Sequence, residues 1–302
     1  LVVIEARIRG KSQRWRIGSG VSRPAPRQQL RTRGTVLGVA WRVGVAVLSL
    51  GVPAWSLTRL LLESQRSELD IGELVGAVGG SVSSSILGAA LALLLALPIA
   101  ALAARYRSRI VRSIEGAAFL GHALPGVVVG LSLVFLTLAV LPAAYQTLAV
   151  LAFAYAVLFL PKAIGSSRSA IAHVPPGLES TARSLGRGPL RAWCTVTGRL
   201  AWPGIAAGTL LVVLTAMKEL PATLMLRPTG FSTLATELWS RTEIEAFGSA
   251  APYALTMIIL ASVPAWLMGR WLARSPETAP STDRVDDEMV RTDEVAYVGG
   301  VR

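Results

Sequence analysis

The sequence is short of the residues from which most enzyme and metal sites are built. It contains one cysteine, Cys194, so it cannot form an intramolecular disulfide. Its two histidines, His122 and His173, lie far apart, and with a single cysteine they give no metal-ligand spacing. It also lacks the glycine-rich loop with Lys and Ser or Thr that cradles nucleotide phosphates, so this chain does not hydrolyse ATP by itself.

Charged residues are scarce as well, at 16% of the chain, and they are concentrated towards its two ends. Apolar residues make up 52%, and the mean hydropathy of +0.54 lies above that of typical soluble proteins. The net charge of +12 therefore indicates basic loops that face anionic lipid headgroups, and not nucleic-acid binding. These features predict an all-α protein that crosses a lipid bilayer several times.

Six apolar segments are long enough to cross a hydrocarbon core of about 30 Å, which takes about 20 helical residues. The predicted spans cover residues 36–62, 81–104, 114–140, 143–164, 200–226 and 249–271. Residues 75–80 are expected to extend the second span as a helix, and Leu124-Pro125-Gly126 breaks the third. The sequence thus predicts a six-helix transmembrane domain at residues 36–272.

The two ends differ from this domain in composition. Residues 1–4 are apolar and are expected to be the last turn of a preceding membrane helix, with an unusual start codon as the alternative. The rest of the segment up to residue 35 is a linker with nine Lys or Arg against one acid, and residues 273–302 are expected to form a disordered tail. With six spans, the basic segments 5–35, 105–112 and 165–199 share one side, which the positive-inside rule makes cytoplasmic, together with both termini.

The 165–199 loop is long for a connection between membrane spans, and its pattern predicts two short amphipathic helices. Leu178, Thr181, Ala182 and Leu185 share one face of the first helix, and Gly186 is placed to end it in a left-handed cap. Pro189 suits the first position of the second helix. Such a pair can press an apolar face into a partner's groove while its arginines meet carboxylates. Alternatively, both helices lie on the lipid headgroups.

The loop resembles the "EAA" loop of permease subunits of ATP-binding-cassette importers. Ala182 and Gly186 match that pattern, the acid is displaced to Glu179 with Ser180 in its place, and the usual Leu-Pro is replaced by Gly198-Arg199. The resemblance spans residues 75–272. It implies the type I importer permease fold, in which two six-helix units face each other around a central path. It also implies that the two-helix loop docks on a cytoplasmic ATPase.

Four further stretches look like ferric-iron importer permeases, which carry two such halves joined by a basic linker. They are Ala123 to Gly126, Lys218 to Thr223, Gly230 to Thr236 and Ala251 to Ala254. The resemblance is to the C-terminal half and implies ferric iron as the substrate, with thiamine, phosphonate or a sulfate-like anion as alternatives. It also implies a bacterial cell membrane, an ATPase dimer that uses the ATP, an extracytoplasmic solute-binding protein and a second permease half, fused or separate. No enzyme activity and no cofactor are expected of this chain.

Two groups of residues are candidates for these roles. The predicted coupling surface consists of Leu178, Glu179, Ala182, Arg183, Leu185, Gly186, Pro189 and Trp193. The predicted translocation path consists of Lys218, Glu219, Pro221, His122 and Pro125. A charge at mid-bilayer costs several kcal/mol unless it is paired or hydrated. Lys218 and Glu219 therefore line a water-filled vestibule, hold helices together, or sit near the surface because the fifth helix ends early at Pro221.

A membrane-embedded enzyme and a passive channel are the rival classes. An intramembrane serine protease needs a nucleophile and a base held together within the membrane. Ser132 and Ser262 lie in predicted spans, but no Gly-x-Ser-Gly does, and His122 has no evident partner. A passive channel leaves the patterned loop without a purpose.

Overall fold

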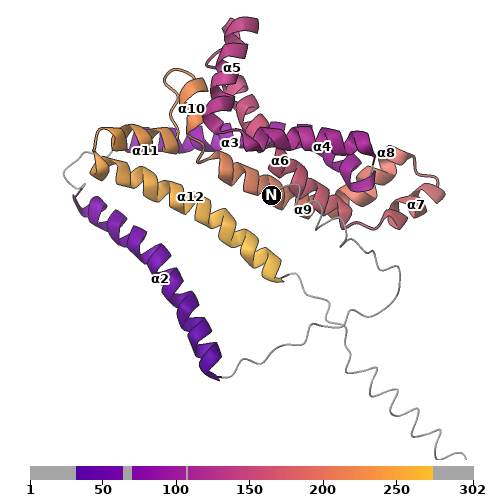
Figure 1. Cartoon of the computed structure of the whole chain (residues 1–302), viewed down its shortest axis with the longest axis horizontal. Helices are drawn as coiled ribbons and strands as arrows, with labels where there is room; N and C mark the ends of the chain where they lie inside the picture. Colours follow the sequence, from indigo (N-terminus) through magenta and orange to yellow (C-terminus); the bar gives the residue numbers. More distant parts are fainter. Residues whose placement is uncertain (1–31, 64–69, 107, 275–302) are drawn as a thin grey trace, which may run out of the picture. The chain divides into compact units, whose positions relative to one another are not determined.

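The computed structural model describes residues 32–63, 70–106 and 108–274, and every regular element in these ranges is helical (Figure 1). By its contacts the chain divides into residues 1–55 and 56–302. The described part of the first unit is α2 (Thr32–Glu63), which contains Pro53 and runs on into the second unit. The predicted linker up to residue 31 and the predicted tail from residue 275 lie outside the described residues.

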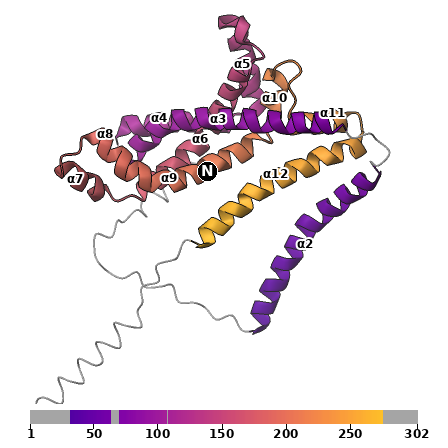
Figure 2. The same ribbon diagram turned by 180° about the vertical axis from the view of Figure 1, so that it is seen from behind.

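The second unit is built on α3 (Ile71–Arg105), α6 (Leu148–Ala172) and α9 (Arg199–Ala216), which pack side by side in both views (Figures 1 and 2). Small residues line the face of α3 that meets α6 and α9, so the backbones approach closely. At Gly88 an added Cβ would lie 2.5 Å from the Cβ of Tyr155 on α6. This seam explains why glycine, alanine and serine recur along α3.

α3 begins at Ile71, before the predicted start of the second span at residue 81. The expectation that residues 75–80 extend this span as a helix is confirmed. Asp70 caps it, and the Asp70 carboxylate accepts hydrogen bonds from the backbone N–H groups of Gly72 (2.8 Å) and Glu73 (3.2 Å). The helix has 35 residues and is therefore about 50 Å long. It is longer than a hydrocarbon core of about 30 Å, which leaves length for a tilted crossing or for ends among the headgroups.

The third predicted span consists of two helices, α4 (Arg109–Ala123) and α5 (Gly126–Val140), which separate at the expected Leu124-Pro125 break. Pro125 lacks an N–H and disfavours a helical residue before it, which ends α4. A short helix, η2 (Pro142–Ala144), makes the turn into α6. The break is confirmed, and each of the two helices has only 15 residues.

The predicted bounds of the fourth and fifth spans are wrong. α6 starts five residues after the predicted start at residue 143 and continues to Ala172, because nothing between residues 165 and 172 breaks a helix before Pro175-Pro176. The fifth span is not one kinked helix over residues 200–226. α9 stops at Ala216, and a separate helix, α10 (Pro221–Leu226), begins at the proline. Pro221 therefore interrupts the helix rather than bending it.

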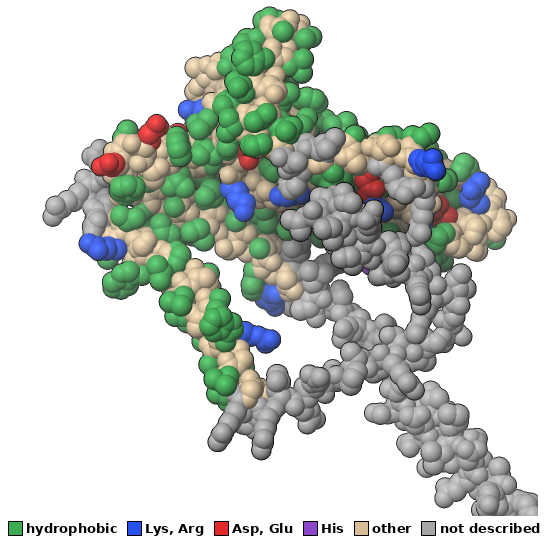
Figure 3. Space-filling view, in the orientation of Figure 1, with side chains coloured by type: hydrophobic (Ala, Val, Ile, Leu, Met, Phe, Trp, Pro, Cys, Tyr) green, Lys and Arg blue, Asp and Glu red, His purple; other side chains and the backbone are tan. Residues whose placement is uncertain are grey.

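The remaining elements are α7 (Pro176–Ser184), α8 (Pro189–Ala192), the π-helical turn η3 (Trp193–Gly198), α11 (Leu234–Glu243) and α12 (Phe247–Arg274). Within the described residues, five helices are long and apolar enough to cross a membrane, and α5 is a shorter apolar helix. Apolar side chains cover much of the visible helical surface in Figure 3. The all-α, multi-pass fold class is confirmed.

Candidate functional site

The two predicted loop helices form a knob, residues 176–198, at one end of α3, α6 and α9 (Figure 1). Gly186 joins them with φ of +85°. The Gly186 N–H donates to the carbonyl of Arg183 (3.0 Å), and the Arg187 N–H donates to the carbonyl of Ala182 (3.2 Å). These two bonds are the Schellman cap, so the expected left-handed ending is confirmed. The second helix continues through η3 directly into α9.

The predicted coupling residues divide into an inner and an outer group. Ala182 is buried, and Trp193 packs against a small apolar cluster that includes Ile171 and Ile205. Leu178, Leu185 and Leu190 are 43%, 78% and 76% exposed. The expected apolar stripe of α7 is therefore only partly buried: Ala182 faces the protein, and Leu178 and Leu185 face outward. Exposed residues that share the outer surface are Arg183, Arg187, Pro189 and Arg191.

Glu179 belongs to the inner group. Its carboxylate accepts a hydrogen bond from Arg105 Nη2 at 2.8 Å and another from the Thr197 hydroxyl. Arg105 Nη1 also donates to the carbonyl of Val174 at 3.0 Å. The sequence pattern places Arg105 in a basic loop and Thr197 on the second loop helix, but it does not predict that either contacts Glu179, because the three residues lie in different segments of the chain.

The helix breaks at Pro125 and Pro221 lie against each other, since α5 packs against α10. We call residues 124–126 and 217–221 the broken-helix junction. Glu219 is half-buried there, and its Oε1 accepts from the Ala222 N–H at 3.3 Å. The same atom would lie 2.9 Å from a Cβ added to Gly126, at the start of α5. The carboxylate therefore sits at the N-terminal ends of two helices, α5 and α10.

The junction unites only part of the predicted path set. Lys218 is exposed, and among the described residues it forms no ion pair. His122 lies near the end of α4, but its side chain is outside the described part of the structure. A buried hydrogen bond that the sequence pattern does not predict links α6 to α10 next to the junction. The hydroxyls of Tyr155 and Thr223 are 2.6 Å apart, and Thr223 donates to the carbonyl of Glu219.

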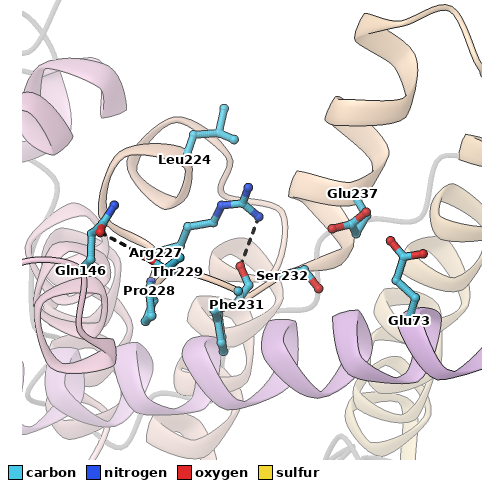
Figure 4. Close-up of a pocket in the computed structure, with 10 residues that line it drawn as sticks. Glu73, Gln146, Leu224, Arg227, Pro228, Thr229, Phe231, Ser232 and Glu237 are labelled. Carbon is cyan, nitrogen blue, oxygen red and sulfur yellow. Dashed lines mark hydrogen bonds between the residues drawn. The ribbon is translucent and has the colours of Figure 1, made fainter.

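A pocket of about 590 Å³ lies at the end of α3 opposite to the knob and is not anticipated by the sequence (Figure 4). Arg227 reaches across it and donates to the carbonyl of Phe231 at 3.1 Å, while Thr229 donates to Gln146 at 3.3 Å. Two carboxylates face it from different helices, Glu73 on α3 and Glu237 on α11. We call this the Arg227 pocket.

Arg241 ties the acidic wall of that pocket together. Its Nη2 lies 2.8 Å from Glu73 and 3.7 Å from Glu237, and it donates to the Tyr253 hydroxyl at 2.9 Å. Burial and the adjacent Glu73 carboxylate raise the pKa of Glu237, and the attraction of Arg241 and Arg227 offsets this only in part. Among the described residues, no group of three or more His, Cys, Asp or Glu is arranged to hold a metal ion.

Residues 96–275 match the family described as "Binding-protein-dependent transport system inner membrane component". The chain is similar to the Fe(3+)-transport system permease protein FbpB 2 of Haemophilus influenzae, with 34% identity over 273 residues, 90% of this chain and 54% of that protein. It is also 32% identical over 138 residues to the molybdenum transport system permease protein ModB of Mycobacterium tuberculosis, covering 42% of this chain and 52% of ModB. The chain spans about half the length of the curated relatives it matches.

Two solved structures share the fold. The inward-facing MetNI methionine ABC transporter superposes with a TM-score of 0.55 and 16% identity, over 66% of this chain and 94% of that one. A bacterial alginate ABC transporter, solved with an alginate-bound periplasmic protein, gives a TM-score of 0.54 and 16% identity, over 81% and 98%. At this level of identity the likeness concerns the fold alone.

Proposed function

Because the chain belongs to the family of inner membrane components of binding-protein-dependent transport systems, we propose that it is a permease unit of an ATP-driven importer of ferric iron. Its helices form one side of the translocation path, and a separate cytoplasmic ATPase dimer supplies the energy. A solute-binding protein delivers the substrate on the other side of the membrane. A second permease half, fused or separate, completes the path.

The observation that carries this proposal is the knob. Its Schellman turn and the inward packing of Ala182 and Trp193 make it a compact unit, while its leucines and arginines remain exposed. An exposed apolar tip ringed by cations suits a groove with carboxylates on its rim. The alternative, that these helices lie on lipid headgroups, leaves the ordered glycine turn without a role.

Closure of the ATPase dimer would draw two such knobs together and shift the helices between inward-open and outward-open states. The broken-helix junction is our candidate for the part of the path that changes shape. Breaks in membrane helices expose backbone groups, which is tolerated where they are buried in protein or line a cavity. Glu219 then presents a carboxylate oxygen to a passing cation.

Ferric iron is favoured over other solutes by the similarity to FbpB 2, which extends over 90% of the chain. The shorter match to ModB makes an oxyanion the second candidate. The test is uptake of radioactive ferric iron by cells that produce the permease with its ATPase and binding protein, with molybdate measured in parallel. Iron accumulation that requires the permease, the ATPase and the binding protein together supports the proposal. Uptake of molybdate without iron would show that the substrate is an oxyanion, and uptake of neither would contradict the proposed transport function.

A further inference from the structure

We infer that Glu179 is a positioning residue that acts with Arg105 to tether the knob to the end of α3, so that movement of the knob is passed to this helix. The inference deepens the proposed function and rests on it, since the ATPase is what would move the knob. It separates Glu179 from the outward residues of the predicted coupling surface, which remain available to a partner.

The geometry of the tether joins four segments at one guanidinium. Arg105 is the last residue of α3, and its Nη2 contacts Glu179 of α7 at 2.8 Å and Thr197 of η3 at 3.4 Å. Its Nη1 holds the carbonyl of Val174, just beyond α6. Thr197, which is fully buried, donates to the same carboxylate oxygen that Arg105 holds. Both helices of the knob are thus bonded to one end of α3.

The tether is largely withdrawn from water. The side chains of Arg105 and Glu179 are 15% and 24% exposed. Charge-assisted hydrogen bonds in such surroundings are stronger and less screened than those between surface charges. Removing either partner leaves the other charge partly buried and poorly compensated. The pair therefore resists separation when force is applied to the knob.

The register of α7 determines where its acid points. Neighbouring residues on a helix point about 100° apart, so an acid at position 180 faces away from the end of α3. Ser180 is exposed, and its hydroxyl donates to the carbonyl of Gly177 at 2.8 Å. The acid at position 179 instead receives both the Thr197 hydroxyl and the Arg105 guanidinium on one carboxylate oxygen.

α3 is suited to pass movement on because it continues without a break from the tether to the Arg227 pocket. At its far end Glu73 lines this pocket and pairs with Arg241 at 2.8 Å. At 35 residues, or about 50 Å, one helix connects the two ends. A knob held to α3 moves with it, whereas a knob released from α3 can tilt alone.

The experiment compares Glu179→Gln, Arg105→Gln and the double variant with wild type, using Ser180→Ala as the matched control on the same helix. Hydrogen exchange of the purified membrane protein is measured first, without any partner. Release of the tether is expected to raise amide exchange in residues 176–184 about tenfold, the scale of one charge-assisted hydrogen bond. Exchange in α6 and the middle of α3, which reports correct folding, stays as in wild type.

Uptake and ATPase binding are then measured on the same variants. We expect each single variant to bind the ATPase but to lose uptake about tenfold, and the double variant to lose no more than either single one. Unchanged exchange in α7, or unchanged uptake, overturns the inference. Loss of ATPase binding in Glu179→Gln but not in Arg105→Gln also overturns it, since Glu179 would then contact the partner. If wild type neither binds the ATPase nor transports, the proposed function fails, while the exchange data still decide whether the tether exists.

Discussion

Single glycine residues set how closely the helices of the bundle approach. A Cβ at Gly88 would lie 2.5 Å from Tyr155, whereas a Cβ at Gly79, on the same helix, meets nothing within 4 Å. We expect Gly88→Ala to lower the free energy of unfolding by about 1–3 kcal/mol through overpacking. Gly79→Ala is expected to be neutral or slightly stabilising because alanine favours helix. Thermal unfolding of both variants in the same detergent provides the comparison, and equal midpoints would contradict the close contact.

The raised pKa of Glu237 predicts a pH dependence of stability. A carboxyl group whose pKa is higher in the folded state stabilises the fold fully below its ordinary value of 4.5. This contribution is lost as the pH rises through the folded-state pKa. Glu237→Gln cannot ionise, so its thermal midpoint relative to wild type should increase between pH 4.5 and neutral pH. If the difference in thermal midpoint between Glu237→Gln and wild type stays constant or falls across this range, burial and Glu73 do not raise the pKa of Glu237.

What the sequence revealed about single residues depended on local signals. Gly186 and Pro189 could be placed because a glycine cap and a proline start are local features of the chain. The bonds of Glu179 to Arg105 and of Tyr155 to Thr223 join residues far apart in sequence. Periodicity carries no information about such pairs. Leu185 and Ala182 share a predicted apolar face, yet only Ala182 is buried, and Leu185 lies just beyond the last residue of α7.

The broken-helix junction is the element on which the proposed path depends. We expect Glu219→Gln to reduce uptake about tenfold, since the neutral amide keeps the shape of the side chain but withdraws the charge from the two helix ends. Glu243→Gln, an exposed acid at the end of α11, serves as the control. The assay is initial-rate uptake at matched amounts of protein in the membrane. If Glu219→Gln transports like the control, the carboxylate has only a structural role.

Helix existence could be predicted at this scale, but helix limits could not. The apolar segments gave every long helix, and Pro125 was correctly read as a break. Pro161, Pro203 and Pro221 all lie within predicted helical pattern, yet the first two are inside continuous helices and only the third starts a new one. What distinguishes Pro221 is the close packing of α10 against α5, where a Cβ at Gly130 would lie 3.1 Å from Ala222. Whether a proline ends a helix therefore depends on tertiary contacts, which the sequence pattern does not show.

For the whole molecule, the distribution of Lys and Arg predicts that the knob is cytoplasmic. Cys194, the only cysteine in the sequence, is exposed on the knob and can be labelled without engineering. We expect a membrane-impermeant maleimide to label it in inverted membrane vesicles and not in intact cells. A Cys194→Ser/Thr229→Cys variant carries its thiol beside the Arg227 pocket. In cells whose outer membrane has been made permeable, this thiol should be labelled, whereas in inverted vesicles it should not. Labelling of Cys194 in intact cells would show that the topology is the reverse of the predicted one.

The measurement that tests the central claim most directly is co-purification of the full-length protein with its ATPase for wild type, Gly186→Val and Gly188→Val. Both glycines have open space around them, but only Gly186 has positive φ, where a β-branched residue is strongly strained. We predict that wild type and Gly188→Val retain the ATPase and that Gly186→Val loses it, because the knob then cannot keep its turn. Retention by all three, or by none, would contradict the claim that this knob couples the membrane helices to an ATPase.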